Sequence, residues 1–460
     1  MDNLQRDYKF VSHTSSLCSK CLKKIDAKII ESGGSIFVLK SCPEHGQFRE
    51  LLEDDAGFYL KHGDYDKPGT ISKTQTAVKN GCPFDCGLCP SHDQHTCNGL
   101  IEITNACDLG CPTCYANSGT GDFLPLEKIN EMLNFFVDSE HGQAEILQIS
   151  GGEPTLHPKI VDIIKLARSK KIKYILLNTN GLRLAKDEKL AEELGRFKGG
   201  FEIYLQFDGL SEKSAMAIRG RDVIGDRKKA IANLSKYRVP ITLVATVVRG
   251  VNDSEVGEVF NYAIGEEWIR GINYQPVAFF GRLPEGAEIK NRVTMTGILK
   301  ALEAQTKGMV KMADFIPLPC DVERVAISYL FKQKGEFVPL IRDIDIKQFL
   351  PAIRNTFQFA PDNVMKEIAE TLDKKGSCCQ IMDMFKSLQK TILPPNYLLM
   401  SQDQKAEFIN NNTFRISATS FVDKYNFDAK SMQKECVHII TPDFKKIPFS
   451  AYNMIHRHRK

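Results

Sequence analysis

Between residues 100 and 310, short apolar runs alternate with segments in which apolar residues recur every three or four positions. The first pattern predicts buried strands and the second predicts amphipathic helices. Six strand–helix pairs follow one another, which is typical of a parallel sheet covered by helices. The predicted strands are LIEIT (100–104), EILQIS (145–150), KYILLNT (173–179), FEIYLQF (201–207), ITLVATVV (241–248) and INYQPVAF (272–279).

The flanking segments follow other patterns. Residues 1–78 contain two possible metal-binding turns around a short alternating stretch with a Gly-Gly turn, and end in a polar linker. This pattern predicts a β-ribbon of the rubredoxin or zinc-ribbon kind, folded around one metal ion. Residues 79–99 form a Gly- and Pro-rich loop with four cysteines, and residues 311–460 mix helical segments with Pro-rich turns. The predicted domains are 1–78, 79–99, 100–310 and 311–460.

The composition is that of a globular protein. Of the 460 residues, 42% are hydrophobic and 26% are charged, and the net charge is +4, which excludes a disordered chain. The basic residues are dispersed apart from the terminal HRHRK, which we expect to be solvated, so no nucleic-acid partner is predicted. Because the sequence shows neither a signal core nor an apolar run near the ~20 residues that span a bilayer, we predict a cytoplasmic location.

The chain contains 14 cysteines, which fall into clusters, and none lies between 115 and 319. In a reducing compartment, clustered cysteines indicate metal ligands before disulfides. The metal chemistry is therefore predicted toward the two ends of the chain, with a cysteine-free middle between them.

Three cysteines, Cys107, Cys111 and Cys114, follow the first predicted strand at a C-x3-C-x2-C spacing, with no fourth cysteine close behind. A cubane [4Fe–4S] cluster takes one thiolate per iron, so three cysteines leave one iron open. That iron could bind the amino and carboxylate groups of S-adenosylmethionine, and electron transfer to the sulfonium would release an adenosyl radical. The alternative is a zinc knuckle whose fourth ligand lies elsewhere.

The second predicted strand ends in ISGGEPT at residues 149–155. Gly151 and Gly152 permit close backbone approach, and Glu153 supplies a carboxylate for the methionine amino group. Alone, the Gly-Gly pair is also typical of an ordinary turn. Because both motifs follow neighbouring strands of one predicted parallel sheet, they should meet at the same edge, and the zinc knuckle becomes the weaker alternative.

Through CDLGCPTCY, SGGEP and the six strand–helix units, residues 100 to about 280 resemble the radical S-adenosylmethionine superfamily. The resemblance implies an α/β fold, a partial (β/α)6 barrel, with a [4Fe–4S] cluster on the cysteine triplet and S-adenosylmethionine bound at the strand ends. Polar residues at these ends are also common as simple caps, and no catalytic residue is identified. The implied cofactor-binding residues are Tyr115, Gly151, Gly152, Glu153, Pro154, Asn180, Gln206, Asp208, Gln275 and Val277.

The other cysteines, with one histidine, divide into three sets of four. The first would hold one mononuclear metal, zinc or iron, that stabilises the ribbon. The second repeats the triplet spacing but has a fourth cysteine nearby, so it is interpreted as a closed auxiliary [4Fe–4S] cluster. The third is interpreted in the same way, although one of its two adjacent cysteines could instead be a free buried thiol. The sets are Cys18, Cys21, Cys42 and His45; Cys82, Cys86, Cys89 and Cys97; and Cys320, Cys378, Cys379 and Cys436.

The segments CSKC, GCPFDCGLCP, TNACDLGCPTCYANSG, LVATVVRGVND and IPFSAYN together resemble a narrower group, over most of the chain. This group comprises the archaeal tetraether lipid synthases and the related class D radical methylases proposed to act on pterins. The resemblance implies C–C bond formation at unactivated sp3 carbons after hydrogen-atom abstraction. We favour coupling of lipid chains or another apolar substrate, with methylation of a pterin or related heterocycle as the alternative.

The implied partners are a small-molecule or lipid substrate and an external low-potential electron donor such as ferredoxin or flavodoxin. A lipid substrate would also entail peripheral membrane contact. The Phe-rich segments LNFFV, PVAFFGR and NTFQFAP could line a lipid tunnel, but such segments are more often core. The alternatives of a different class are an electron carrier, with four protein ligands to every cluster, and a zinc-dependent nucleic-acid-binding protein.

Overall fold

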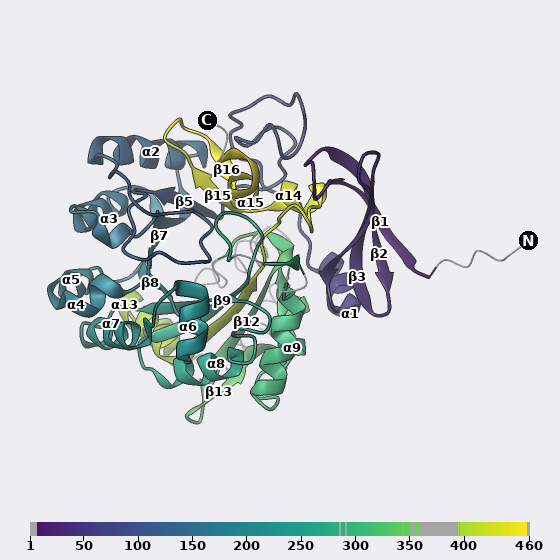
Figure 1. Ribbon diagram of the computed structural model, residues 1–460. Helices are drawn as coiled ribbons and strands as arrows, with labels where there is room; N and C mark the ends of the chain where they lie inside the picture. The colour runs from purple at the N-terminus through teal and green to yellow at the C-terminus, as the bar shows by residue number, and fades with distance from the viewer. Residues whose placement is uncertain are drawn as a thin grey trace, which may run out of the picture.

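The computed structural model describes residues 7–284, 287–289, 292–343, 345–350, 355–357, 394 and 396–457. In this part of the chain a small antiparallel sheet near the N-terminus stands beside a larger α/β unit, as Figure 1 shows.

The N-terminal sheet has four strands in the order β1-β2-β3-β4, all antiparallel. In β3, Ile36, Val38 and Lys40 are buried and alternate with more exposed residues, so one face of the sheet covers a small core. Tyr59 of α1 (Ala56–Leu60) closes this core. The strands are β1 (Lys9–Leu17), β2 (Lys24–Ser32), β3 (Ser35–Cys42) and β4 (Gly46–Glu53).

A buried lysine joins this sheet to the C-terminal part of the chain. Lys40 Nζ pairs with Glu50 at 2.8 Å and donates to the carbonyl oxygens of Lys424 and Tyr425, each at 3.0 Å. Because a buried ammonium group must find acceptors, these contacts fix the position of the sheet against the segment that precedes α14 (Ala429–Lys434).

The larger sheet has twelve strands, in the order β11-β12-β14-β10-β9-β8-β7-β6-β5-β15-β16, and β13 pairs with β12. Strands β5 to β10 are parallel, so the predicted α/β fold with six parallel strands is confirmed. The six are β5 (Asn98–Glu102), β6 (Ala144–Ser150), β7 (Ile172–Thr179), β8 (Phe201–Gln206), β9 (Ile241–Val247) and β10 (Ile269–Pro276).

Amphipathic helices cover this sheet, as α2 shows: Ile129, Met132, Leu133 and Phe136 share one buried face at helical spacing. The helices around the sheet (Figure 1) pack such faces against one continuous core. They are α2 (Leu126–Ser139), α3 (Ile160–Arg168), α4 (Leu182–Lys186), α5 (Glu188–Leu194), α6 (Glu212–Arg219), α7 (Ile224–Lys236), α8 (Val256–Gly265) and α9 (Met295–Gln305). The later helices are α10 (Ile346–Phe349), α13 (Gln402–Asn412) and α15 (Phe449–Ala451).

Strands from the C-terminal region extend both edges of the parallel core. β14 pairs in parallel with β10, with Arg415 opposite Gly271, and β15 pairs in parallel with β5, with Val437 opposite Asn98. The sequence did not predict these strands, because parallel pairing needs a long crossover and nothing local to a strand identifies its partner. The strands added are β11 (Ile316–Leu318), β12 (Asp321–Gln333), β13 (Glu336–Pro339), β14 (Thr413–Thr419), β15 (Val437–Ile440) and β16 (Lys446–Pro448).

Within the described residues, the larger sheet surrounds a cavity of about 470 Å³. Side chains from β5 through β10, and from β12, β14 and β15, line it, so the sheet must curve strongly around it. Within the described residues the strand order still ends at β11 and β16, so the curved sheet is a barrel that stays open.

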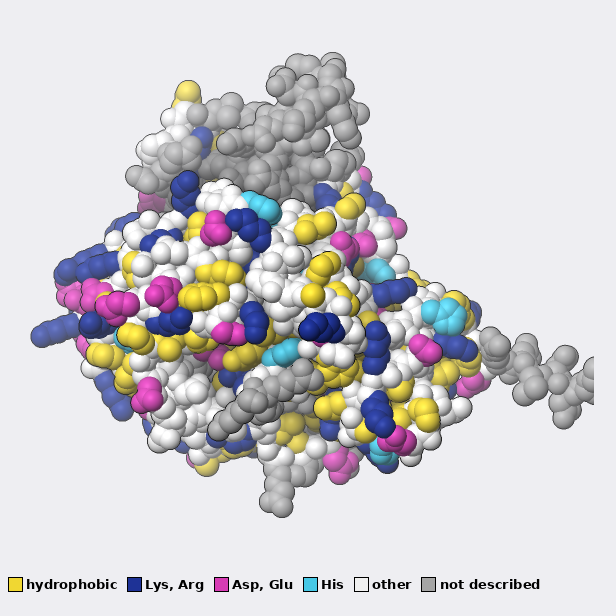
Figure 2. All heavy atoms as spheres, turned by 90° about the horizontal axis from the view of Figure 1, so that it is seen from above, with side chains coloured by type: hydrophobic (Ala, Val, Ile, Leu, Met, Phe, Trp, Pro, Cys, Tyr) yellow, Lys and Arg dark blue, Asp and Glu magenta, His cyan; other side chains and the backbone are white. Residues whose placement is uncertain are grey.

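The surface and the helices of the described residues bear on possible partners. None of the helices in the described ranges is long and apolar enough to cross a membrane. Figure 2 shows one face of the molecule, on which Lys and Arg side chains are interspersed with Asp and Glu. Because both signs of charge are mixed, the described part of this face should attract a polyanion only weakly at long range.

Candidate active site and metal centres

The cysteine triplet lies in the loop of residues 103–124, which follows β5 at the C-terminal edge of the parallel strands. The N–H of Cys107 donates to the carbonyl oxygen of Gly119 at 2.8 Å, and the N–H of Cys114 donates to that of Arg282 at 2.9 Å. The loop is therefore held both to itself and to the segment that follows β10.

All three thiol side chains of the triplet line the cavity. Burial raises the pKa of Cys107 to about 12, and the nearby negative charge of Glu153 adds to the effect. Such a thiol ionises only when a cation binds, as a metal ligand must. At least two of the three sulfur atoms lie more than 4.8 Å apart. Their wider spacing suits a cluster better than one zinc ion, whose thiolates lie about 4 Å apart.

The two glycines of SGGEP allow the loop after β6 to pack directly on the triplet loop. Gly151 has a φ of 143°, in the region that favours glycine, and a Cβ there would lie 2.3 Å from the carbonyl oxygen of Thr104. A Cβ on Gly152 would lie 2.3 Å from the carbonyl oxygen of Ala106, next to Cys107. The close backbone approach predicted from the two glycines thus brings the loop after β6 into contact with the triplet loop.

We expect Gly152→Ala to displace the triplet loop, because the new Cβ would meet backbone atoms rather than a movable side chain. Overpacking of this kind costs about 1–3 kcal/mol, or about 5- to 150-fold in S-adenosylmethionine affinity. Equilibrium binding to the reconstituted protein measures the change. Gly110→Ala is the matched control, because a Cβ at Gly110 meets nothing within 4 Å. Equal binding by the two variants would contradict the packing role of Gly152.

Glu153 links the loops after β6 and β7. Its carboxylate accepts from Thr155 N (3.0 Å) and Oγ1 (2.5 Å), from Thr179 Oγ1 (2.8 Å) and from Asn180 N (2.7 Å). Three of these donors meet Oε1 and only Asn180 N meets Oε2, so Oε2 keeps acceptor capacity. Glu153 also lines the cavity, so its contact with the methionine amino group stays a prediction; burial raises the pKa of this carboxyl group.

Asp208 holds two arginines beside the cavity. It accepts from Arg219 Nε at 2.7 Å and Nη2 at 2.6 Å, and from Arg227 Nη1 at 3.1 Å. Although burial opposes ionisation of the carboxyl group, the two guanidinium groups keep the pKa of Asp208 well below its usual range. The arginines, and not Asp208, are among the residues that line the cavity.

The other predicted cofactor-binding residues lie close by. Asn180 Nδ2 donates to Asp108 at 2.7 Å, the Tyr115 hydroxyl lies 3.1 Å from Ser150 Oγ, and Gln206 Nε2 donates to Asp208 at 2.8 Å. Pro154 lies outside the cavity lining, as Asp208 does. The predicted residues that line the cavity are Tyr115, Gly151, Gly152, Glu153, Asn180, Gln206, Gln275 and Val277.

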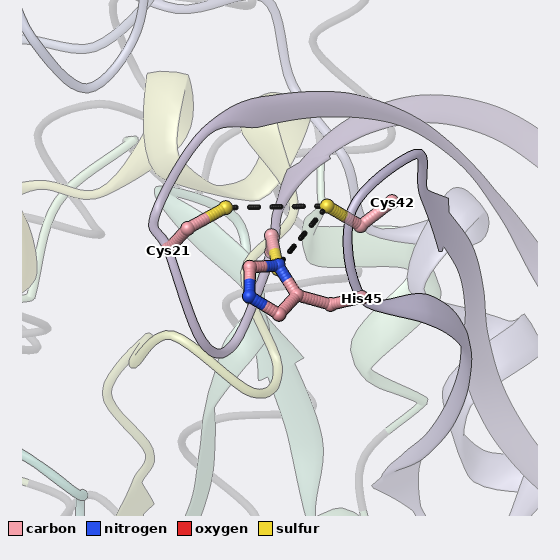
Figure 3. Close-up of side chains that lie close together, drawn as sticks. Cys21, Cys42 and His45 are labelled. Carbon is pink, nitrogen blue, oxygen red and sulfur yellow. Dashed lines mark hydrogen bonds between the residues drawn. The ribbon is translucent and has the colours of Figure 1, made fainter.

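The N-terminal sheet brings the first predicted ligand set together. The ligand atoms of Cys18, Cys21, Cys42 and His45 all lie within 4.8 Å of one another. Figure 3 shows Cys21 and Cys42 pointing toward each other beside the His45 ring, with Sγ atoms 3.9 Å apart and Cys42 Sγ 3.5 Å from His45 Nδ1. Burial opposes ionisation of Cys18, but backbone N–H groups of the turn lower its pKa to about 6. This geometry fits one tetrahedral ion.

We expect Cys18→Ser to lower the yield of soluble protein rather than remove activity selectively, because the small core of this sheet depends on the metal. Expression yield and metal content per chain measure the effect. Ser41→Ala, at an exposed position next to Cys42, is the control and should leave both unchanged. A Cys18→Ser protein that is soluble, stable and inactive would contradict a structural role.

The structure corrects the predicted partition of the remaining cysteines. The Sγ atoms of Cys97, Cys320 and Cys436 lie within 4.8 Å of one another, so Cys97 does not join Cys82, Cys86 and Cys89. The reason is the pairing of β5 with β15: the N–H of Cys97, just before β5, donates to the carbonyl oxygen of Cys436, just before β15, at 3.0 Å.

His95 lies at the edge of this group of three thiols, with Nε2 3.7 Å from Cys97 Sγ and 3.6 Å from Glu145. Burial raises the pKa of Cys97 to about 12. Against its own burial, hydrogen bonds from Cys436 and Cys97 lower the pKa of Cys320 to about 6. The three thiols can thus share one metal group. Cys378 and Cys379, the other predicted members, lie outside the described residues.

The loop that contains Cys82, Cys86 and Cys89 has a small pocket of its own, which His92 also lines. Burial and the neighbouring thiols raise the pKa of Cys86, with Cys82 the largest influence. His92 Nε2 lies 3.0 Å from His438 Nε2 in β15. With Cys97 assigned elsewhere, three cysteines of the predicted set remain here, with His92 beside them.

The far end of the cavity carries polar residues that the sequence analysis missed. Glu202, Tyr204 and Gln206 alternate along β8 and all line the cavity, but only Gln206 was predicted. Arg415 of β14 and Asn273 of β10 face the same space. The alternation of polar residues in FEIYLQF was a usable signal, since every second residue of a barrel strand points inward.

The chain is similar to several known proteins. The model of the radical SAM superfamily matches residues 101–263, and that of the HMPTM N-terminal zinc ribbon domain matches residues 10–54. The chain is 34% identical to 7,8-dihydro-6-hydroxymethylpterin dimethyltransferase of Methanocaldococcus jannaschii, over 96% of this chain and 94% of the relative. It is 31% identical to a probable GTP 3′,8-cyclase of Pyrococcus abyssi, over 36% of this chain and about half (52%) of that one. Among solved structures it resembles SuiB of Streptococcus suis bound to S-adenosylmethionine, with a TM-score of 0.38 and 19% identity, over 46% of this chain and 47% of SuiB.

Proposed function

The chain belongs to the radical S-adenosylmethionine superfamily, and from this premise we propose that it is a methylase of a reduced pterin or a closely related small heterocycle. The likeness to a pterin dimethyltransferase over nearly the full length of both chains supports this substrate class. Coupling of lipid chains, which the sequence favoured, has less support than the methylase it kept as the alternative.

The polarity of the cavity is the observation that carries the proposal. Its volume of about 470 Å³ is typical of small-molecule sites, which measure roughly 300–1,000 Å³. Between the triplet and the far end, its walls present amide, hydroxyl and charged groups such as Gln148, Asn178, Glu202 and Asn273. Gln148, Asn178 and Asn273 already have partners within the walls, but Glu202 keeps acceptor positions and the buried Arg270 Nε has no hydrogen-bond partner among the described groups. A hydrocarbon chain would leave these two groups unsatisfied at a cost, whereas a heterocycle could satisfy them.

The triplet would hold the [4Fe–4S] cluster of the superfamily, with S-adenosylmethionine beside it. When bound, this pair supplies reductive cleavage to a 5′-deoxyadenosyl radical. The chain's own contribution is placement: the loop after β6 packs on the triplet loop, and Glu153 fixes the loop after β7. An external low-potential donor such as ferredoxin or flavodoxin would supply the electron, and a folate-like methylene donor the carbon.

The other metal sites follow the corrected partition. A zinc ion in the N-terminal sheet is supported by the zinc-ribbon match and by the four close ligands. An auxiliary iron–sulfur cluster would use Cys82, Cys86 and Cys89. The group of Cys97, Cys320 and Cys436, whose sulfur atoms are as close as those of the zinc-ribbon set, would hold a further metal group.

Product analysis tests the function. The anaerobically reconstituted protein is incubated with S-adenosylmethionine, a low-potential reductant, a methylene-folate and 7,8-dihydro-6-hydroxymethylpterin, and products are analysed by mass spectrometry. We expect a methylated pterin, together with 5′-deoxyadenosine formation that is faster with the pterin than without it. If an isoprenoid ether lipid, and not the pterin, accelerates 5′-deoxyadenosine formation, the pterin proposal is wrong and lipid coupling replaces it.

A further inference from the structure

The far end of the cavity contains charged and polar groups that lie away from the triplet and have no part in binding its cluster. Glu202 is the second residue of β8 and Arg415 the third of β14, so both lie at the N-terminal ends of their strands. Gln206 lies four positions after Glu202 in β8, a distance of about 13 Å along the strand. These groups are therefore remote from the triplet and face whatever occupies the inner part of the cavity.

Glu202 is held in place but keeps acceptor capacity. It is 3% exposed, its Oε2 accepts from the Tyr174 hydroxyl at 2.9 Å, and its Oε1 accepts from the Thr242 hydroxyl. Arg415 Nη2 lies 3.8 Å from Oε1 and donates to Thr242 at 3.0 Å, so the ion pair is partly indirect. An ionised carboxylate offers about four acceptor positions, and these two hydrogen bonds leave about half of them for a ligand.

A donor without a partner lies in the same cavity. Arg270 of β10 lines it, and its buried Nε makes no hydrogen bond to any described group. Asn273, three residues further along β10, is already satisfied, since it donates to Tyr204 and accepts from Ser417 and Thr419 at 3.0 Å each. A buried N–H with no partner is expected to be satisfied by a ligand or by water.

We propose that Glu202, positioned by Tyr174 and Thr242, binds the 2-amino-4-oxo edge of a pterin-type ring. That edge presents two neighbouring N–H donors, which match a carboxylate in a bidentate pair, and an adjacent carbonyl oxygen that Arg270 can serve. The opposite end of the ring then points toward the triplet. This inference rests on the proposed function and extends it, because it names the recognition residue and the edge recognised.

Binding measurements without S-adenosylmethionine or reductant test the inference on the reconstituted protein. The probes are 6-hydroxymethylpterin and 6-hydroxymethyllumazine, which carries a carbonyl in place of the 2-amino group, each titrated by fluorescence. The wild type should prefer the pterin. Glu202→Gln should bind the pterin about 10- to 100-fold more weakly, because an amide offers one acceptor and presents a donor to a donor. It should lose the preference over the lumazine. Glu193→Gln, on the exposed face of α5, is the control and should match the wild type.

The outcomes separate the two proposals. If the wild type binds the pterin and Glu202→Gln binds it equally well with unchanged preference, Glu202 is not the recognition residue and the proposed function stands. If the wild type binds neither probe, the pterin function falls, and this inference with it. Should Glu202→Gln fail to fold, Tyr174→Phe removes one hydrogen bond that positions the carboxylate and should reduce the preference for the pterin; an unchanged preference in that variant overturns the inference.

Discussion

Replacing Cys107, Cys111 or Cys114 by Ala is expected to reduce 5′-deoxyadenosine formation to the background of the assay. Each thiol lines the cavity from the same short loop, and each would bind one iron of the cluster that S-adenosylmethionine approaches. With two ligands left, the cluster loses both its attachment and the geometry that leaves a single iron open. The measurement is 5′-deoxyadenosine by chromatography after anaerobic reconstitution, with iron content determined on the same samples.

Cys86→Ala is the matched control, because it removes a cysteine at the same spacing from the other C-x3-C-x2-C run. Cys86 lines a separate pocket with Cys82, Cys89 and His92, apart from the large cavity. We expect this variant to cleave S-adenosylmethionine without forming the methylated product. Equal cleavage by Cys86→Ala and Cys111→Ala would mean that the roles of the two runs have been assigned wrongly.

Features encoded over short stretches of the chain could be predicted from the sequence. The six parallel strands follow from apolar runs bounded by amphipathic helices, and the ribbon ligands from the closely spaced pairs Cys18/Cys21 and Cys42/His45. In each case the residues that act together are neighbours in sequence or belong to one regular repeat, so their period and spacing carry the information.

Features that depend on the pairing of distant strands could not be predicted from the sequence. Cys97 and Cys436 meet because β15 adds to β5 in parallel after a crossover of more than three hundred residues, and no spacing rule reports such a contact. Glu202 and Arg415 approach for the same reason, across strands that β9 and β10 separate in the sheet. The cysteine count suggested sets of four, but only the sheet topology decides which thiols share a site.

Residue type was also a weaker guide to role than to location. Glu153 and Asp208 were predicted to bind the cofactor from strand ends; they follow β6 and β8, and their contact with the cofactor stays a prediction. Asp208 pairs with the two buried arginines at the cavity wall, whereas Glu153 accepts from the loop after β7 and still lines the cavity. A carboxylate at a strand end has the same appearance in sequence whether it meets a ligand or a buried guanidinium group.

Asp208→Ala is expected to destabilise the fold by about 3–5 kcal/mol, because it leaves two buried guanidinium groups without their anion. Arg219 and Arg227 have side chains only 10% and 2% exposed, and both pair with Asp208. Since the folded-state pKa of Asp208 is lowered, the stabilisation is fully present above about pH 4 and is lost as the pH falls through the folded pKa. Urea denaturation at neutral pH, followed by circular dichroism, measures the shift in free energy of unfolding.

The neighbouring surface pair provides the control for this substitution. Arg221 and Asp226 also form an Arg–Asp pair, at 3.0 Å, but their side chains are 46% and 29% exposed. Exposed pairs contribute at most about 1 kcal/mol, so Asp226→Ala should be nearly neutral. Arg219 lines the cavity near Cys111. Asp208→Ala should therefore also weaken S-adenosylmethionine binding under conditions in which the variant is still folded. If the two Asp→Ala variants unfold at the same urea concentration, water must reach the arginines, and the ion-pair account of this wall fails.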